Sequence, residues 1–106
     1  MADLLILEFE DLGDTDYGAI NELLGIDMSS GEGDWPPGLH THTAASKDGN
    51  WVVVEIWETQ EDQDDFMKSR LGPALHKAGV TKPPKRVEWS KLKAHHSPKK
   101  ASAKAK

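Results

Sequence analysis

The chain contains no cysteine and no long hydrophobic run, and both absences exclude whole classes of protein. Without cysteine there are no disulfide bonds, thiol nucleophiles or thiolate metal sites. The mean hydropathy of -0.62 and the lack of a long apolar stretch argue against a transmembrane helix. The apolar start LLIL follows Asp3 and soon meets Glu8 and Glu10, so we expect no signal peptide. These features are compatible with a reducing cytoplasm, where we expect the protein to reside.

Familiar catalytic motifs are also missing from the sequence. There is no phosphate-binding loop, no glycine-rich dinucleotide turn, no G-x-S-x-G and no H-E-x-x-H. Nucleotide-dependent, serine-hydrolase and zincin chemistries therefore have no support.

Basic residues are scarce in the body of the chain. The first 90 residues hold 7 basic residues against all 18 acidic ones, a net charge of -11, and the remaining residues carry +6. An acidic body repels nucleic acid and acidic membrane surfaces, so we expect neither as a partner. We expect one domain over residues 1–94. The polar, low-complexity residues 95–106, HHSPKKASAKAK, are predicted to form a disordered basic tail.

What the chain does contain is a regular succession of strand and helix patterns. Apolar alternation predicts strands over residues 4–10, 39–45, 50–58 and 85–93. Helical spacing of apolar residues predicts one helix between the first two strands and another between the last two. The order βαββαβ is that of the ferredoxin-like fold, an α+β arrangement in which both helices cover one face of an antiparallel sheet.

Short polar signals mark the ends of these elements. Asp14 or Thr15 is expected to cap the first helix and Thr59 the second. The Asp48-Gly49 pair predicts a tight hairpin between the second and third strands. Gly72-Pro73 should kink or split the second helix, because proline cannot donate to the preceding turn.

The third strand, in NWVVVEIWET, is the most informative segment. Its side chains alternate between two faces, with Val52, Val54 and Ile56 on one and Val53, Glu55 and Trp57 on the other. An aliphatic face beside a face with a carboxylate and an indole indicates packing on one side and a chamber on the other. Because one copy leaves a sheet face uncovered, we expect a homodimer that encloses Glu55 and Trp57 in a barrel.

Three segments, WVVVEIWET, FMKSRLGPAL and PPGLHTHTA, together resemble the dimeric α+β barrel superfamily and, within it, the antibiotic-biosynthesis-monooxygenase-like proteins. The resemblance covers roughly residues 3–93 and implies a ferredoxin-like domain that forms a dimeric barrel. For activity it implies a cofactor-free monooxygenase or a related isomerase or cyclase. The superfamily also contains heme-degrading enzymes and many proteins of unknown role, so the fold alone does not select an activity.

Residue matches within this resemblance narrow the expectation. Trp57 matches the tryptophan that ends the third strand and faces the cavity in quinone-forming members. The asparagine that precedes it in that pattern is Val53 here, which cannot hydrogen-bond a substrate oxyanion. In heme-degrading members the second helix carries a tryptophan where this chain has Ser69. We therefore expect no heme and no other cofactor.

His40 and His42 carry the sharpest chemical signal. Residues i and i+2 of a strand share a face, so both imidazoles should point toward the face that carries Glu55 on the paired strand. A carboxylate there would orient His42 and raise its basicity, so His42 and Glu55 are the candidate catalytic pair and His40 a candidate ligand-binding residue. Two alternatives remain open: both histidines are interface or surface residues, or the two imidazoles and the carboxylate bind a metal ion. We expect no metal.

Aromatic residues complete the predicted site. Trp57, Trp51 and Tyr17 are assigned as a ligand-binding wall for a flat, conjugated molecule, and the alternative is that they pack in the core. Trp35 either covers the mouth of the cavity or fastens its loop. The predicted partner is a small hydrophobic or aromatic molecule. The predicted function is small-molecule binding with acid–base or oxygenase chemistry, and the alternative is a non-catalytic ligand-binding or dimerisation module.

Overall fold

The structure, a computed structural model, describes residues 2–96. Ten elements follow one another along the chain: β1 (Asp3–Phe9), α1 (Asp14–Leu24), β2 (Ile26–Asp27), β3 (Glu32–Gly33), β4 (Leu39–Lys47), β5 (Asn50–Trp57), α2 (Gln60–Phe66), the π-helical turn η1 (Met67–Leu71), α3 (Gly72–Lys77) and β6 (Arg86–Lys91). The predicted βαββαβ order is confirmed. The small β2–β3 hairpin is an addition that the loop composition did not reveal.

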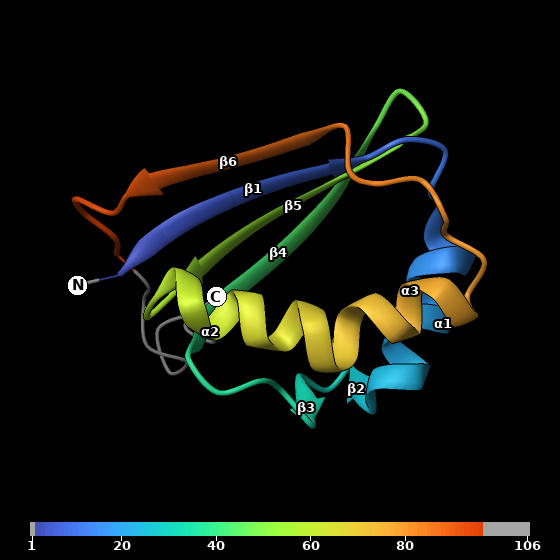
Figure 1. The fold of residues 1–106 in the computed structure, drawn as a ribbon, viewed down its shortest axis with the longest axis horizontal. Coiled ribbons are helices and arrows are strands. Elements are labelled where there is room, and N and C mark those ends of the chain that lie inside the picture. The colour runs from blue at the N-terminus through green and yellow to red at the C-terminus, as the bar shows by residue number, and fades with distance from the viewer. Residues whose placement is uncertain (1, 97–106) are drawn as a thin grey trace, which may run out of the picture.

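The main sheet has four strands in the order β4-β5-β1-β6, and every neighbouring pair is antiparallel. Figure 1 shows the sheet as one layer, with α1, α2, η1 and α3 together on one side of it. This is the predicted ferredoxin-like α+β architecture. The other face of the sheet is not covered by any element of residues 2–96. Within one chain, therefore, only one face of the sheet is packed against helices.

Alternation along β1 and β5 places the core. Leu5, Leu7 and Phe9 of β1 are buried beneath the helices, together with Trp51, Val53, Glu55 and Trp57 of β5. Glu55 and Trp57 therefore face α1 and α2 of their own chain. The expectation that they line a barrel closed by a second subunit is wrong, because the helices pack on the same sheet face and bury these side chains.

The first helix begins one residue earlier than its polar residues predict. Gly13, rather than Asp14 or Thr15, is the N-cap, and the carboxylate of Asp16 accepts the backbone N–H of Gly13 at 3.1 Å. This contact satisfies the backbone donor of the N-cap residue and corresponds to one half of a capping box, because glycine has no side chain to accept in return. Gly25, with φ of 75°, ends the helix in the left-handed conformation that glycine adopts without strain.

The other turn signals are confirmed. Asp48 and Gly49 both have positive φ, 53° and 82°, as a type I′ hairpin turn requires. The hydroxyl of Thr59 accepts the backbone N–H of Asp62 at 3.0 Å and caps α2.

The predicted break at Gly72-Pro73 is a π-helical turn. Residues 67–71 widen the helix just before Pro73, and the N–H of Gly72 donates to the carbonyl of Met67, five residues earlier. A side chain at position 72 would bring its Cβ to 2.8 Å from that same carbonyl oxygen, so glycine is required for the close approach. Single π-helical turns of this kind often lie beside functional sites.

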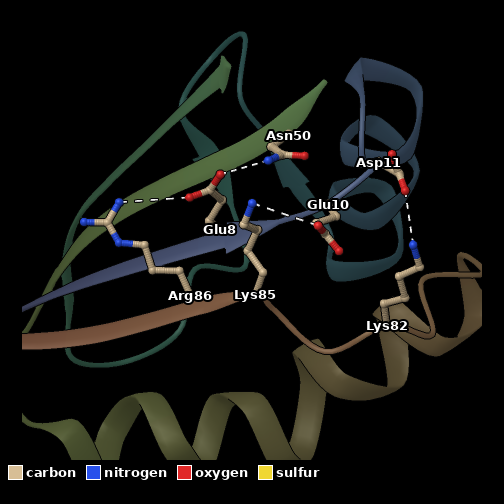
Figure 2. Close-up of polar contacts among 7 residues, drawn as sticks. All are labelled: Glu8, Glu10, Asp11, Asn50, Lys82, Lys85 and Arg86. Carbon is tan, nitrogen blue, oxygen red and sulfur yellow. Dashed lines mark hydrogen bonds and ion pairs between the residues drawn. The ribbon is translucent and has the colours of Figure 1, made fainter. Parts of the chain in front are cut away.

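Polar contacts fasten β6 and the chain before it to the sheet (Figure 2). Glu8 of β1 accepts from the side-chain amide of Asn50 at 2.9 Å and lies 4.0 Å from Arg86. Lys82 pairs with Asp11 at 3.1 Å. These groups are mostly exposed, so each ion pair contributes little to the stability of the fold.

Two expectations concern the chain as a whole. Within residues 2–96 no helix combines the length and the apolar character needed to cross a membrane. Residues 97–106 of the expected basic tail lie outside the described residues, so the tail stays a prediction.

Candidate functional site

A small cavity of about 60 Å³ lies between the sheet and the helices. Its walls come from β1, α1, the β2–β3 region, β4, β5, α2, η1 and α3, and most of the lining residues are aliphatic or aromatic. The polar residues that line it are Tyr17, Asn21, His42 and Glu55. A few polar groups in an apolar hollow are the usual composition of a small-molecule site.

Three of these residues form a hydrogen-bonded chain. Nδ1 of His42 lies 2.6 Å from Oε2 of Glu55, its directly opposite partner across the β4–β5 ladder. Nε2 of His42 lies 2.5 Å from the hydroxyl of Tyr17 on α1. The side chains of His42 and Glu55 are only 13% and 9% exposed, so these contacts are largely shielded from water. The predicted proximity of His42 and Glu55 is thus present.

The carboxylate of Glu55 is held from a second side. Its Oε1 accepts the indole N–H of Trp57 at 2.8 Å, from the same face of β5. A buried carboxylate needs hydrogen-bond donors to offset its lost hydration. Trp57 and His42 supply one donor to each oxygen.

Tyr17 lies where the hydrogen-bonded chain meets the aromatic wall. Its ring is 4.9 Å from the Trp51 ring, centroid to centroid. Its plane is within 3° of the His42 imidazole plane at a centroid distance of 6.0 Å, so the two rings lie end to end with the hydroxyl between them. Burial raises the pKa of Tyr17 above its ordinary value of 10.0, the amide of Asn21 lowers it, and the negative charge of Glu55 raises it further.

The prediction that His40 and His42 share the cavity is wrong. A β-bulge between Leu39 and Thr41 inserts His40 as an extra residue, so Leu39 and His42 are the ones that line the cavity. His40 is exposed and instead contacts Glu58 at 2.9 Å. Because the bulge shifts the alternation of side chains by one residue, the i, i+2 rule fails at this point.

The assignment of Trp57 as a ligand-binding wall also needs correction. Its side chain is fully buried, it packs against Phe66, and it is not among the residues that line the cavity. Trp51 and Tyr17 do line it. The aromatic residues that line the cavity are therefore Trp51, Tyr17, Trp35, Phe9 and Phe66, and Trp57 lies one layer deeper.

The metal alternative required His40, His42 and Glu55 to converge. The structure separates His40 from the other two, and residues 2–96 contain no group of three or more histidine, aspartate or glutamate side chains placed to hold a metal ion. Of the three residues, only His42 and Glu55 contact each other.

The loop before β4 forms the outer wall of the cavity. Trp35 and Pro36 line it, and the Trp35 ring lies 5.8 Å from the His42 ring. Arg70 of η1 holds this loop by donating to the backbone carbonyls of Asp34 at 2.6 Å and Leu24 at 2.9 Å. Trp35 thus covers the site, and its indole N–H also donates to the carbonyl of Gly31 at 3.0 Å, so it fastens its own loop as well.

Sequence reasoning missed one polar residue of the site. Asn21 lies four residues after Tyr17, on the same stripe of α1 as Leu24, and lines the cavity. A polar side chain within an apolar helical stripe was the available signal.

No protein-family model matches the sequence, and no curated protein matches it. Several solved structures do share its fold. An antibiotic-biosynthesis-monooxygenase-type protein from Chloroflexus aurantiacus is 13% identical, with 92% of this chain and 98% of that chain covered at a TM-score of 0.63. A monooxygenase from the gene ActVA-Orf6 of Streptomyces coelicolor, in complex with the ligand nanaomycin D, is 17% identical, with 92% and 93% covered at a TM-score of 0.57. A protein of unknown function from Nitrosomonas europaea is 16% identical, with 92% and 93% covered at 0.59.

These similarities establish the fold of the chain. It has the ferredoxin-like α+β architecture of antibiotic-biosynthesis-monooxygenase-like proteins, as the sequence resemblance implies. At identities of this size the likeness does not carry an activity, and one of the similar structures is itself a protein of unknown function.

Proposed function

We propose that this protein binds a small hydrophobic or aromatic molecule beneath its helices and performs acid–base chemistry on it, as a cofactor-free monooxygenase or a related isomerase or cyclase. The observation that carries this proposal is the contact of His42 with Glu55 at 2.6 Å at the wall of an apolar cavity. An imidazole oriented by a carboxylate is a typical device for moving a proton near neutral pH. The shared fold of the Streptomyces coelicolor monooxygenase supports it.

The chemistry would start with removal of a proton from the bound molecule. In a monooxygenase of this kind the resulting carbanion reacts with O₂, and conversion of a CH₂ group to a carbonyl releases one water. The electrons come from the substrate itself, so no further reductant is required. In an isomerase or cyclase the same anion is reprotonated elsewhere or attacks a second carbon of the substrate.

The size of the cavity favours a second candidate. A volume of about 60 Å³ is well below the ~150 Å³ of a cavity that accommodates benzene. An aromatic ligand therefore requires the walls to move, and the loop that carries Trp35 and Pro36 is a wall that belongs to no helix and no strand of the main sheet. If the walls do not open, the second candidate applies: the protein is a non-catalytic module and the cavity is a packing defect.

The homodimer is part of the proposal, with its interface on the open face of the sheet. The centre of this face carries Leu4, Ile6, Val52 and Val54, which are only partly buried in one chain. Thr41 and Thr43 border it on β4, and the charged groups around Glu8 and Arg86 border it near β6 (Figure 2). An apolar centre with a polar rim is the usual anatomy of a subunit interface.

Binding of nanaomycin D, followed by quenching of tryptophan fluorescence, tests the first part of the proposal, because Trp35 and Trp51 line the cavity. Oxygen uptake and product analysis with hydroxylated polycyclic aromatics test the second. His42→Ala should abolish turnover, whereas His40→Ala should leave it intact. Binding without turnover for any such compound would favour the non-catalytic module. Full turnover by His42→Ala would rule out the assignment of His42.

A further inference from the structure

Both nitrogen atoms of His42 already have partners inside the protein. Nδ1 contacts Glu55 at 2.6 Å and Nε2 contacts the hydroxyl of Tyr17 at 2.5 Å. An imidazole with no free nitrogen cannot exchange a proton directly with a ligand. If the site performs acid–base chemistry, another group must reach the ligand on behalf of His42.

The donors and acceptors fix the direction of every hydrogen bond in this chain. An ionised Glu55 only accepts, so Nδ1 of His42 and the indole nitrogen of Trp57 are its donors. In the neutral imidazole, Nε2 then carries the lone pair and accepts from the hydroxyl of Tyr17. Tyr17 therefore donates its hydrogen to His42. The amide of Asn21 hydrogen-bonds to the same oxygen, which leaves one lone pair available for a ligand.

We propose that Tyr17 is the residue that exchanges a proton with the ligand, with His42 as its proton acceptor and Glu55 and Trp57 as positioning residues. This inference rests on the proposed acid–base function of the site and names its substrate class. The hydrogen-bonded residues Tyr17, His42 and Glu55 suit a small neutral ligand. Its acidic C–H or O–H group would lie next to a carbonyl or an aromatic ring. Such a group becomes an anion that the new charge on His42 stabilises.

The proton transfer balances without any other reactant. The O–H bond of Tyr17 breaks and an N–H bond forms at Nε2 of His42. The Tyr17 oxygen then takes the proton of the ligand, whose electron pair stays on the ligand. The product is a ligand anion beside an imidazolium that is hydrogen-bonded to Glu55. The reverse sequence protonates an anion.

The groups around Tyr17 keep its hydroxyl protonated until His42 accepts the proton. From β4 and β5, the titratable groups that face it are His42 and Glu55. From its own helix, the amide of Asn21 is the polar neighbour. The walls of the cavity on β1, α2, η1 and α3 present the apolar side chains Leu7, Phe9, Phe66, Leu71 and Leu75. Tyr17 therefore remains a neutral phenol until His42 accepts its proton, in line with the raised pKa that burial gives it.

A chromophoric phenol tests the assignment without knowledge of the natural substrate. 4-Nitrophenol is small and aromatic, and its visible absorbance reports whether it is neutral or ionised. It would be titrated against the wild-type protein, Tyr17→Phe, His42→Ala and His40→Ala, each shown to be folded by circular dichroism. The ratio of ionised to neutral bound probe should fall about tenfold in Tyr17→Phe and in His42→Ala and stay unchanged in His40→Ala.

Each other result decides against the inference. Binding with the same ionisation in wild type and Tyr17→Phe overturns the role of Tyr17 and leaves the proposed ligand site standing. A fall in His42→Ala alone transfers the role to His42. Absence of binding to the wild type overturns both the inference and the ligand site. If Tyr17→Phe does not fold, an unchanged ratio in His42→Ala overturns the inference, since that variant removes the imidazole that accepts the proton of Tyr17.

Discussion

The indole N–H of Trp57 donates to the carboxylate of Glu55, two residues earlier on the same face of β5, at 2.8 Å. Trp57 is one of the two largest side chains that are completely buried, and Glu55 is one of two buried acidic residues. This contact connects the hydrophobic core to the hydrogen-bonded chain at the cavity. It makes the core tryptophan responsible for the orientation of the site rather than for contact with a ligand.

Trp57→Phe should lower the free energy of unfolding by more than the loss of side-chain volume alone would. The substitution retains a ring against Phe66 but leaves one oxygen of Glu55 buried without a donor. Trp51→Phe is the matched control, because the Trp51 indole N–H is buried and has no partner within the described part of the chain. We expect Trp57→Phe to cost about 1–3 kcal/mol more than Trp51→Phe.

Chemical denaturation of both variants measures this difference. Equal losses of stability would mean that the hydrogen bond to Glu55 contributes nothing. A greater loss for Trp51→Phe would contradict the assignment of Trp57 as the residue that holds the carboxylate.

The two histidines of β4 should differ in their effect on stability. His42→Ala removes partners from the buried Glu55 and from Tyr17 and should cost about 2 kcal/mol or more. His40→Ala removes only an exposed contact with Glu58 and should change stability by no more than about 0.5 kcal/mol. Thermal unfolding of the two alanine variants gives the comparison, and similar losses would contradict the bulged geometry of β4.

Two helical glycines should respond to alanine in opposite directions. Gly18 lies inside α1 with no atom within 4 Å of an added Cβ, so Gly18→Ala should stabilise the protein by about 0.5–1 kcal/mol. At Gly72 the added Cβ meets the Met67 carbonyl oxygen at 2.8 Å, so Gly72→Ala should destabilise it. Urea denaturation of the pair measures both signs. A stabilising Gly72→Ala would show that the π-helical turn relaxes easily to an α-helix.

We expect the stability of the folded protein to decrease at alkaline pH because of Tyr17. Because the folded state raises the pKa of Tyr17 above 10.0, the folded protein keeps this proton at a pH where the unfolded chain has lost it. The contribution to stability is therefore complete below about pH 10 and is lost as the pH rises toward the folded pKa. Since Tyr17 is the only tyrosine, ultraviolet difference absorbance follows its ionisation alone.

Tyr17→Phe supplies the control for this dependence. Its stability should fall less steeply than that of the wild type above about pH 10, because no phenol remains to ionise. A tyrosine that ionises at or below its ordinary value would contradict the buried contact with His42.

The proposed dimer predicts a change of mass on substitution of the open sheet face. Val54→Asp places a charge at the apolar centre of that face and should give a species near the 11.7 kDa chain mass in place of one about twice that mass. Val87→Asp introduces the same change at an exposed position on β6, on the opposite sheet face, and should leave the dimer intact. Sedimentation equilibrium distinguishes the two. A wild-type mass near 11.7 kDa would overturn the proposed dimer.

Local patterns determined the four strands of the main sheet, the two helical segments and the contact between His42 and Glu55. Alternation along the third strand assigned the faces of Val53, Glu55 and Trp57, and residues directly opposite in a hairpin are neighbours whatever packs above them. The Asp48-Gly49 turn fixed the register of that pair. These inferences hold because hydrogen-bond geometry over a few residues decides them.

The sequence by itself determined the βαββαβ order, the two faces of β5 and the pairing of His42 with Glu55. Only the tertiary structure decided which face of the sheet the helices cover, because both faces carry enough apolar surface to pack. It also decided the bulge that removes His40 from the cavity and the approach of the Tyr17 hydroxyl to His42 from α1. These contacts depend on how elements far apart in the sequence pack against each other. The residue pattern of a single segment carries no information about that packing.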